Sequence, residues 1–298
     1  MRRAARVAAA ETTPSAPTGL AWRCRDRVFE LADRVLVMGV VNVTPDSFSD
    51  GGQFLEPAAA LAHARALLDE GADLIDLGAE STRPGSAPVP AAEQLRRLMP
   101  VLEAILSTGA TVSIDTASAE VARATLAAGA HVVNDVTALG DPAMAAAVAS
   151  TGAGLVLMHM RGTPATMQRA PHYDDVVEDV GRFLAVRRDS AIQAGIPRES
   201  VALDPGIGFG KTLEHNLRLI ARIDQLAALG RPIVLGASRK SFLGHLLDDA
   251  PSDERLEGGL AAAAIAVLLG ARIIRTHDVR ATVRAARVAG AVANARTS

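Results

Sequence analysis

Short apolar runs closed by turn residues recur eight times along the chain. They cover about 35–41, 73–77, 110–115, 131–134, 154–159, 201–204, 232–236 and 271–275. Runs of this length that are rich in Val, Ile and Leu and end in Gly, Pro, Asn or Asp are typical of buried strands. The pattern therefore predicts eight β-strands.

A helix-like stretch separates every consecutive pair of these runs, and one more follows the last run. These stretches cover 57–70, 91–107, 117–128, 141–150, 174–194, 215–229, 254–269 and 278–294. They show apolar periodicity, or Pro near the start and Gly just after the end. Strict alternation predicts parallel strands. Eight units in roughly 265 residues predict a closed (β/α)8 TIM barrel, with an open doubly wound sheet as the alternative.

Composition limits the kinds of partner that the chain can have. The 298 residues are 49% apolar with a formal net charge of −2, so the chain can bury a large core but has no basic excess for nucleic acid. The apolar stretch 258–271 is shorter than the ~20 residues of a membrane span. The single cysteine, Cys24, excludes an internal disulfide and fits a reducing compartment. We expect a cytoplasmic protein that binds neither nucleic acid nor membrane.

The first 18 residues differ from the rest of the chain. Arg2, Arg3 and Arg6 are followed by an alanine run too short for a signal-peptide core and then by a Thr/Pro/Ser/Ala segment. An Arg-rich, acid-poor start also resembles an organelle transit peptide, but Ala and Arg are frequent throughout this chain. We interpret 1–18 as a disordered extension and 19–298 as one barrel domain.

Polar side chains gather where the predicted strands end, and no comparable cluster precedes the strands. In a (β/α)8 barrel the C-terminal ends of the strands form the face that carries the active site, so these residues are expected to meet. They are Asn42, Glu80-Ser81-Thr82-Arg83, Asp115, Asn134-Asp135, His159, Asp204, Ser238-Arg239-Lys240-Ser241 and Arg275-Thr276-His277-Asp278.

Three of these residues, Asp115, Asn134 and Asp204, suit the edge of a flat heterocycle. A carboxylate accepts two parallel hydrogen bonds from an amidine-like edge such as that of a 2-amino-4-oxopyrimidine, and an amide donates and accepts at the adjoining positions. Each residue alone is equally compatible with a strand-end cap or an internal ion pair. The prediction therefore depends on the three occurring together.

A second set is cationic and suits a diphosphate. Its members are Arg83, Arg275 and His277, with Asn42 and Thr82 as neutral oxygen ligands. Guanidinium groups bind phosphate in a bidentate manner, and an amide oxygen suits Mg²⁺, which keeps waters and bridges phosphate oxygens. We expect a diphosphate with Mg²⁺, and Asn42 as the metal ligand. A surface pair between Arg275 and Asp278 and a structural His277 are the alternatives.

The segment Ser238–Leu243 is expected to begin a helix, whose free N–H groups favour an anion such as a carboxylate. Lys240 would lie across the heterocycle or donate to its carbonyl, and Phe209 from the Gly-rich loop 206–210 would supply an aromatic wall. An ordinary basic surface turn is the alternative, and the Gly-rich loop alone is a weak signal.

Eight segments, in order along about 35–279, make the chain resemble the dihydropteroate synthase family of the bacterial folate pathway. They are 38–52, 80–85, 113–116, 134–136, 157–160, 204–211, 236–242 and 275–279. The resemblance implies a Mg²⁺-assisted condensation of 6-hydroxymethyl-7,8-dihydropterin diphosphate with p-aminobenzoate, which gives dihydropteroate and pyrophosphate.

The resemblance also assigns roles to individual residues. It places Asp115, Asn134, Met158, Asp204 and Lys240 in the pterin site. It places Asn42, Thr82, Arg83, Arg275 and His277 in the diphosphate and metal site. It places Pro84, Phe209, Lys240 and Ser241 in the p-aminobenzoate pocket, which sulfonamide drugs occupy in this family. We expect Asn42, Arg83, Lys240, Arg275 and His277 to act in catalysis.

Two other functions fit the same barrel. A methyltransferase acting on methyltetrahydrofolate and a corrinoid protein would need the heterocycle set but not the cationic set. A paralogue that binds a pterin or folate without catalysing the condensation is the other alternative, although the intact Asn42, Thr82-Arg83 and Ser238–Ser241 argue against it. The long segment 42–56 is expected to close over the site as a lid, with Gly51-Gly52 as its hinge.

The stretch 258–270 predicts a helix that is apolar on every face. A helix in the outer ring of a barrel is normally amphipathic, because one side faces water. We therefore expect a homodimer in which this helix and the one that begins near Asp278 form the interface. The alternative is that the small alanines simply tolerate exposure.

Overall fold

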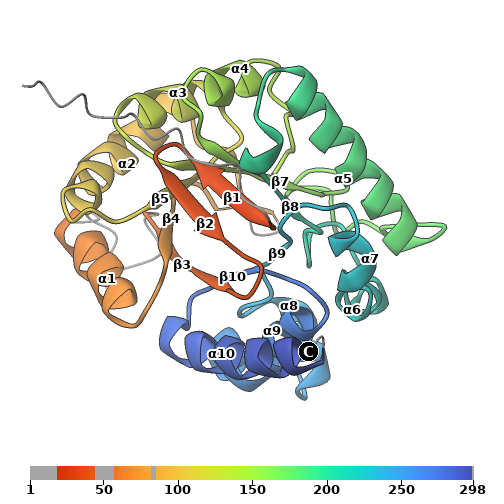
Figure 1. Ribbon diagram of the computed structural model, residues 1–298. Coiled ribbons are helices and arrows are strands. Elements are labelled where there is room, and N and C mark those ends of the chain that lie inside the picture. Colours follow the sequence, from red (N-terminus) through yellow and green to blue (C-terminus); the bar gives the residue numbers. More distant parts are fainter. Residues whose placement is uncertain (1–18, 44–56, 82–84, 297–298) are drawn as a thin grey trace, which may run out of the picture.

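Eight parallel strands form the centre of the fold in the computed structural model, which describes residues 19–43, 57–81 and 85–296. They are β3 (Leu36–Asn42), β4 (Leu74–Gly78), β5 (Val112–Asp115), β6 (Val132–Asp135), β7 (Gly154–Met158), β8 (Val201–Asp204), β9 (Val234–Leu235) and β10 (Ile273–Thr276). Their order is β8-β7-β6-β5-β4-β3-β10-β9, and a parallel bridge between Leu203 and Ile233 joins the two outer strands (Figure 1). The predicted closed barrel is confirmed.

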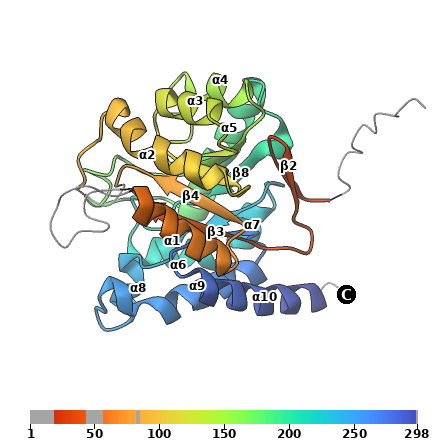
Figure 2. The ribbon, with the colours of Figure 1, turned by 90° about the vertical axis from the view of Figure 1, so that its left-hand side faces the viewer.

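Helices surround this barrel on its outside, as Figures 1 and 2 show. They are α1 (Pro57–Asp69), α2 (Ala91–Leu106), α3 (Ala119–Ala127), α4 (Met144–Ala149), α5 (Val176–Gln193), α6 (Leu213–Ala221), α7 (Ile223–Ala227), α8 (Ser241–Leu246), α9 (Leu256–Leu268) and α10 (Val279–Ala295). The helix predicted over 215–229 is two helices, because Arg222 leaves the helical conformation at φ −126°. None of the described helices has the length and apolar content to cross a membrane.

A hairpin that the sequence pattern did not predict closes the N-terminal end of the barrel. Its strands are β1 (Ala21–Cys24) and β2 (Arg27–Glu30), and they lie across the barrel opening in Figure 1. Trp22 and Cys24 are fully buried, and the Trp22 indole donates to the Ser200 carbonyl at 3.0 Å. A Cβ at Gly154 would lie 2.6 Å from Cys24 Sγ, so a glycine is needed opposite this thiol. Cys24 therefore has a packing role.

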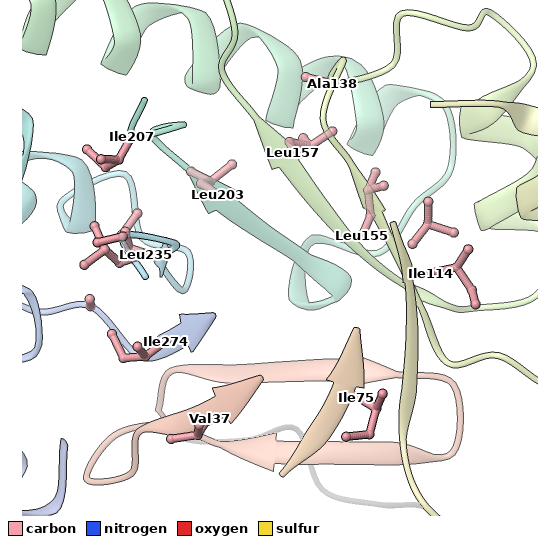
Figure 3. Packing of buried hydrophobic residues seen from close by; sticks show 14 of the residues in the cluster. Val37, Ile75, Ile114, Ala138, Leu155, Leu157, Leu203, Ile207, Leu235 and Ile274 are labelled. Atoms are coloured by element: carbon pink, nitrogen blue, oxygen red, sulfur yellow. The ribbon is translucent and has the colours of Figure 1, made fainter. Parts of the chain in front are cut away.

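Side chains alternate along each strand between the helices and the barrel interior. The outward set, which includes Val37, Ile75, Ile114, Leu155 and Leu203, packs under the helices (Figure 3). The inward set is apolar near the hairpin, where its members are Leu36, Met38, Leu74, Val132, Val156, Ala202, Val234 and Ile273. Farther along most of the strands the inward positions become polar, as at Asp115, Asn134 and Asp204. Water is thus excluded from one end of the barrel and polar groups gather at the other.

Candidate active site

The sheet register brings the predicted polar residues to one end of the barrel. Asn42, Gly78, Asp115 and Asn134 are successive partners across β3, β4, β5 and β6, so they form one row at the strand ends. Asp204 on β8 is the partner of Met158 on β7. All of these positions point inward by strand alternation. The residues predicted for a heterocycle therefore do meet at a single mouth.

Arg275 enters this mouth from β10 and is held by two carboxylates. Its Nε lies 2.7 Å from Asp76 Oδ2, and its Nη2 lies 2.9 Å from Asp115 Oδ2. Asn134 Nδ2 donates to the same Asp76 oxygen at 3.1 Å. Arg275 thus belongs to the network of the heterocycle set. The alternative surface pair with Asp278 is not formed between these residues, since the guanidinium lies inside the barrel.

Burial and charge compete in setting the pKa values of this network. Burial raises the pKa of Asp115 to about 7, against the attraction of the Arg275 charge. Burial likewise raises the pKa of Asp204, while Lys240 and the Gly206 N–H act in the opposite direction. Burial alone would lower the pKa of Arg275, but the charges of Asp76 and Asp115 outweigh it and raise that pKa. The guanidinium therefore stays charged.

Lys240 and Phe209 lie together on the other side of the mouth. The Lys240 ammonium donates to the Ile207 carbonyl and lies 4.5 Å from the centre of the Phe209 ring. Burial lowers the pKa of Lys240 to about 8, although the Asp204 charge acts to raise it. Ser241 is the exposed first residue of α8 beside Lys240. The predicted aromatic wall and its lysine are therefore neighbours.

Residues after β9 and β10 form a second polar group at the rim. Ser238 Oγ lies 3.1 Å from His277 Nδ1 and 3.4 Å from Asp278 Oδ2. Asp278 also accepts from Arg239 Nη2 at 2.6 Å. The structure thus fixes His277 through a serine. Thr82, Arg83 and Pro84, and residues 44–56 of the lid predicted over 42–56, lie outside the described residues.

Asp76 is the site residue that sequence reasoning missed. It lies within the apolar run of β4 and is fully buried, and its Oδ1 has no hydrogen-bond partner among the described residues. An aspartate in the middle of a buried strand, two residues before Gly78, was the available signal. Because side chains alternate along β4, Asp76 points into the barrel like the row of strand-end residues.

Comparison with known proteins identifies the class of this barrel. The profile of the family described as pterin binding enzyme matches residues 38–277. The chain belongs to this family, and the relatives that it matches include dihydropteroate synthases of several bacteria. It is 48% identical to dihydropteroate synthase of Escherichia coli K12 over 261 residues, which are 87% of this chain and 92% of the relative.

Solved structures agree with this assignment. The Xanthomonas albilineans dihydropteroate synthase with 4-aminobenzoic acid matches with a TM-score of 0.86 and 47% identity, over 92% of this chain and 98% of that chain. The same enzyme in complex with 7,8-dihydropteroate matches with a TM-score of 0.82 and 45% identity, over 91% and 98%. The Yersinia pestis dihydropteroate synthase with a sulfonamide drug complex matches with a TM-score of 0.87 and 43% identity, over 93% and 100%.

Proposed function

We propose that the chain condenses 6-hydroxymethyl-7,8-dihydropterin diphosphate with p-aminobenzoate, giving dihydropteroate and pyrophosphate. The observation that carries this proposal is the polar cluster at the barrel mouth, in a chain 45% identical to a dihydropteroate synthase solved with 7,8-dihydropteroate. The cluster consists of Asp76, Asp115, Asn134, Asp204 and Arg275. No observation on the described residues favours methyl transfer.

The pterin ring binds to the buried carboxylates and the amide. Asp115 and Asp204 accept from its amino and ring N–H groups, and Asn134 pairs with the adjoining edge. In a site with little water these hydrogen bonds are stronger than they are in solution. Met158, which is 3% exposed beside Asp204, supplies an apolar contact to the ring.

The reaction breaks the bond between the pterin methylene carbon and the bridging diphosphate oxygen, and the electron pair leaves with pyrophosphate. The p-aminobenzoate nitrogen forms the new bond to that carbon and loses a proton. Negative charge grows on the leaving group, so nearby cations stabilise the transition state. Among the described residues, Arg275 binds its two carboxylates through Nε and Nη2, so Nη1 can donate to a diphosphate oxygen. His277 and, from the sequence, Thr82 and Arg83 complete this set.

The second substrate binds beside Phe209 and Lys240. The Phe209 ring offers an apolar face to the flat p-aminobenzoate ring, while Lys240 and the Ser241 segment attract its carboxylate. Pro84 belongs to the same pocket by the sequence resemblance. Sulfonamides share the shape of p-aminobenzoate and would compete for this pocket, in line with the drug complex of the Yersinia pestis relative.

Mg²⁺ is the cofactor that we propose, with Asn42 as its protein ligand. No group of three or more His, Cys, Asp or Glu side chains suited to a metal occurs in the described part of the chain. A Cβ at Gly78 would lie 3.6 Å from Asn42 Oδ1, so the glycine leaves space beside this oxygen. One amide oxygen fits a cation that keeps most of its waters and binds mainly through substrate phosphates. When bound, Mg²⁺ neutralises charge on the diphosphate.

A direct assay tests the proposed function. Purified protein is incubated with the dihydropterin diphosphate, p-aminobenzoate and Mg²⁺, and pyrophosphate release is followed. We expect release only when both substrates are present, with dihydropteroate formed in equal amount. Binding of the pterin without turnover would support the non-catalytic paralogue instead. Release without p-aminobenzoate would point to simple hydrolysis.

We also propose a homodimer formed by α9 and α10. These two helices pack against each other (Figure 2). They leave apolar side chains exposed, since Ile265, Val288 and Val292 are 47%, 66% and 50% accessible. Burial of this surface in a second copy would remove it from water. Light scattering is expected to give twice the chain mass, and Ala264→Glu is expected to give a monomer. A monomeric wild-type protein would contradict the dimer.

A further inference from the structure

Lysine is almost absent from this chain. Of its 31 basic residues, 29 are arginines, and the only lysines are Lys211 and Lys240. Both contact the Gly-rich loop between β8 and α6. Lys240 already has a place in the proposed site, whereas Lys211 makes no hydrogen bond to a described side chain of the pterin set or the diphosphate set. Residue 211 is therefore a lysine in a chain whose other basic residues, apart from Lys240, are all arginines.

Lys211 is buried with three acceptors around one nitrogen. It is 3% exposed, and its Nζ lies 3.0 Å from His159 Nδ1, 3.0 Å from the Phe209 carbonyl and 3.3 Å from the His159 carbonyl. An ammonium has three hydrogens for these acceptors, whereas a planar guanidinium cannot direct three donors from one point. Burial and the Lys211 charge hold the pKa of His159 at about 3, so this imidazole is neutral. Burial also lowers the pKa of Lys211 well below its ordinary value, while the charge of Asp204 acts to raise it.

The Gly-rich loop is fixed at five consecutive carbonyls. The Gly206 carbonyl accepts from the Phe209 N–H at 3.0 Å, and the Ile207 carbonyl accepts from Lys240. The Gly208, Phe209 and Gly210 carbonyls accept from Gln168 at 2.9 Å, from Lys211 at 3.0 Å and from the Tyr173 hydroxyl at 2.8 Å. The two lysines thus hold the carbonyls on either side of Gly208. Phe209 cannot rotate its peptide plane without losing the Lys211 bond.

The same loop packs backbone against backbone on the end of β7. A Cβ at Gly206 would overlap the His159 carbonyl oxygen, and one at Gly210 would overlap the Arg161 carbonyl oxygen. Both glycines have positive φ, at 66° and 65°. Because the His159 carbonyl also accepts from Lys211, the lysine joins the loop to the strand at its closest approach. The loop position is therefore coupled to this one ammonium.

We propose that Lys211 is a positioning residue for the second substrate. Through the His159 and Phe209 carbonyls it fixes the Phe209 ring, and together with Lys240 it sets the width of the pocket for a flat aryl amine. This inference rests on the proposed function, because it assumes that p-aminobenzoate binds against Phe209. The pterin contacts at Asp115 and Asn134 lie on other strands. Asp204 accepts from the Gly206 N–H at the start of the same loop, so a smaller effect on pterin binding is expected to accompany the loss for the second substrate.

Three variants test this role. Lys211→Met keeps the approximate length of the side chain and removes its hydrogen-bond donors, whereas Lys211→Arg keeps a cationic side chain. Gln168→Ala is the control, because it removes a hydrogen bond from an exposed side chain to the same loop. We expect KM for p-aminobenzoate to rise about tenfold or more in both Lys211 variants, the scale of one lost charged hydrogen bond. Pterin diphosphate affinity by calorimetry and all constants of Gln168→Ala are expected to stay within about threefold. An unchanged KM, or equal losses for both substrates, would refute the positioning role.

Spectroscopy separates this inference from the proposed function. Lysine-selective ¹³C labelling gives signals from only two side chains, so Lys211 is observed directly in the wild-type protein. We expect its signal to shift with dihydropteroate and not with 6-hydroxymethylpterin alone, and the Phe209 ring signals to broaden in Lys211→Met without any ligand. A Lys211 signal that dihydropteroate does not move would overturn the inference even if the variants fail to fold. Wild-type protein without turnover, but with Phe209 broadening in Lys211→Met and a Lys211 signal that dihydropteroate shifts, would overturn the proposed catalysis and leave Lys211 as the residue that positions Phe209 for ligand binding.

Discussion

Asp76→Asn tests the buried charge network most directly. Asp76 Oδ2 accepts from Arg275 Nε at 2.7 Å and from Asn134 Nδ2 at 3.1 Å, and the side chain is fully buried. The substitution keeps the shape of the side chain and removes its charge. The oxygen that remains can still accept from both donors, but it no longer carries a charge to balance the guanidinium, and the new NH₂ group takes the place of Oδ1, which has no described partner. Neither Arg275 Nε nor Asn134 Nδ2 has another acceptor among the described residues.

The expected magnitude follows from the partner that Arg275 keeps. Breaking a buried ion pair by removing one member costs about 3–5 kcal/mol, because the other charge is left uncompensated. Arg275 retains Asp115 at 2.9 Å, so the compensation is only halved. A charged hydrogen bond contributes about 1.5–3 kcal/mol. We therefore expect Asp76→Asn to lower the free energy of unfolding by about 2–3 kcal/mol.

Urea denaturation provides the assay, because the chain has a single tryptophan. Trp22 is fully buried in the hairpin that closes the barrel, so its fluorescence reports unfolding of the core. Glu178→Gln is the matched control, since its ion pair with Arg182 has side chains that are 70% and 63% exposed. Such an exposed pair contributes about 0.5 kcal/mol or less. If Asp76→Asn were as stable as this control, Asp76 would not support Arg275.

Three further results are expected. Asp204→Asn should weaken pterin diphosphate binding by about 10- to 100-fold in calorimetry, the scale of a lost charged partner, and wild-type affinity would remove Asp204 from the site. Because the pKa of Lys240 is lowered to about 8, its ammonium is present below that pH. If turnover needs the charged Lys240, the rate should fall as the pH rises through about 8. The free energy of unfolding should rise between about pH 8 and the ordinary lysine pKa, because in that range the unfolded chain binds the proton and the folded chain does not. A rate that stays flat up to about pH 10 would contradict the role of Lys240. Gly206→Ala should destabilise the fold by about 3 kcal/mol or more, since the new Cβ would overlap the His159 carbonyl. Gly152→Ala is the control, because Gly152 has the same φ of 66° but open space around it, and this change should cost about 1 kcal/mol. Equal decreases in melting temperature for the two variants would refute the close packing at Gly206.

The local pattern of the sequence determined most of the barrel. Each of the eight strands buries both faces, so each appears as a short apolar run that ends where the chain turns polar. Because parallel strands end at the same side of the barrel, Asp115, Asn134 and Asp204 could be grouped before any coordinates were known. Their convergence on one mouth is confirmed. The division at residue 18 stays a prediction.

The hairpin and the break in the sixth helical unit could not be read from the pattern. The strands β1 and β2 have four residues each, and β2 is largely exposed, so no apolar run distinguishes them. Trp22 and Cys24 are buried only because the open end of the barrel lies against them. The break at Arg222 interrupts a stretch whose apolar periodicity continues on both sides.

Partners distant in sequence were decided by the tertiary structure alone. Arg275 pairs with Asp76 and Asp115, which are 199 and 160 positions away, so no local pattern connects them. Lys211 is an ordinary loop lysine in the sequence, and it becomes a buried ammonium only when the His159 and Phe209 carbonyls close around it. Periodicity records which face of an element is buried, because that depends on neighbours along the chain. Which charge meets which carboxylate depends on how the barrel closes, and closure is a property of all eight strands together.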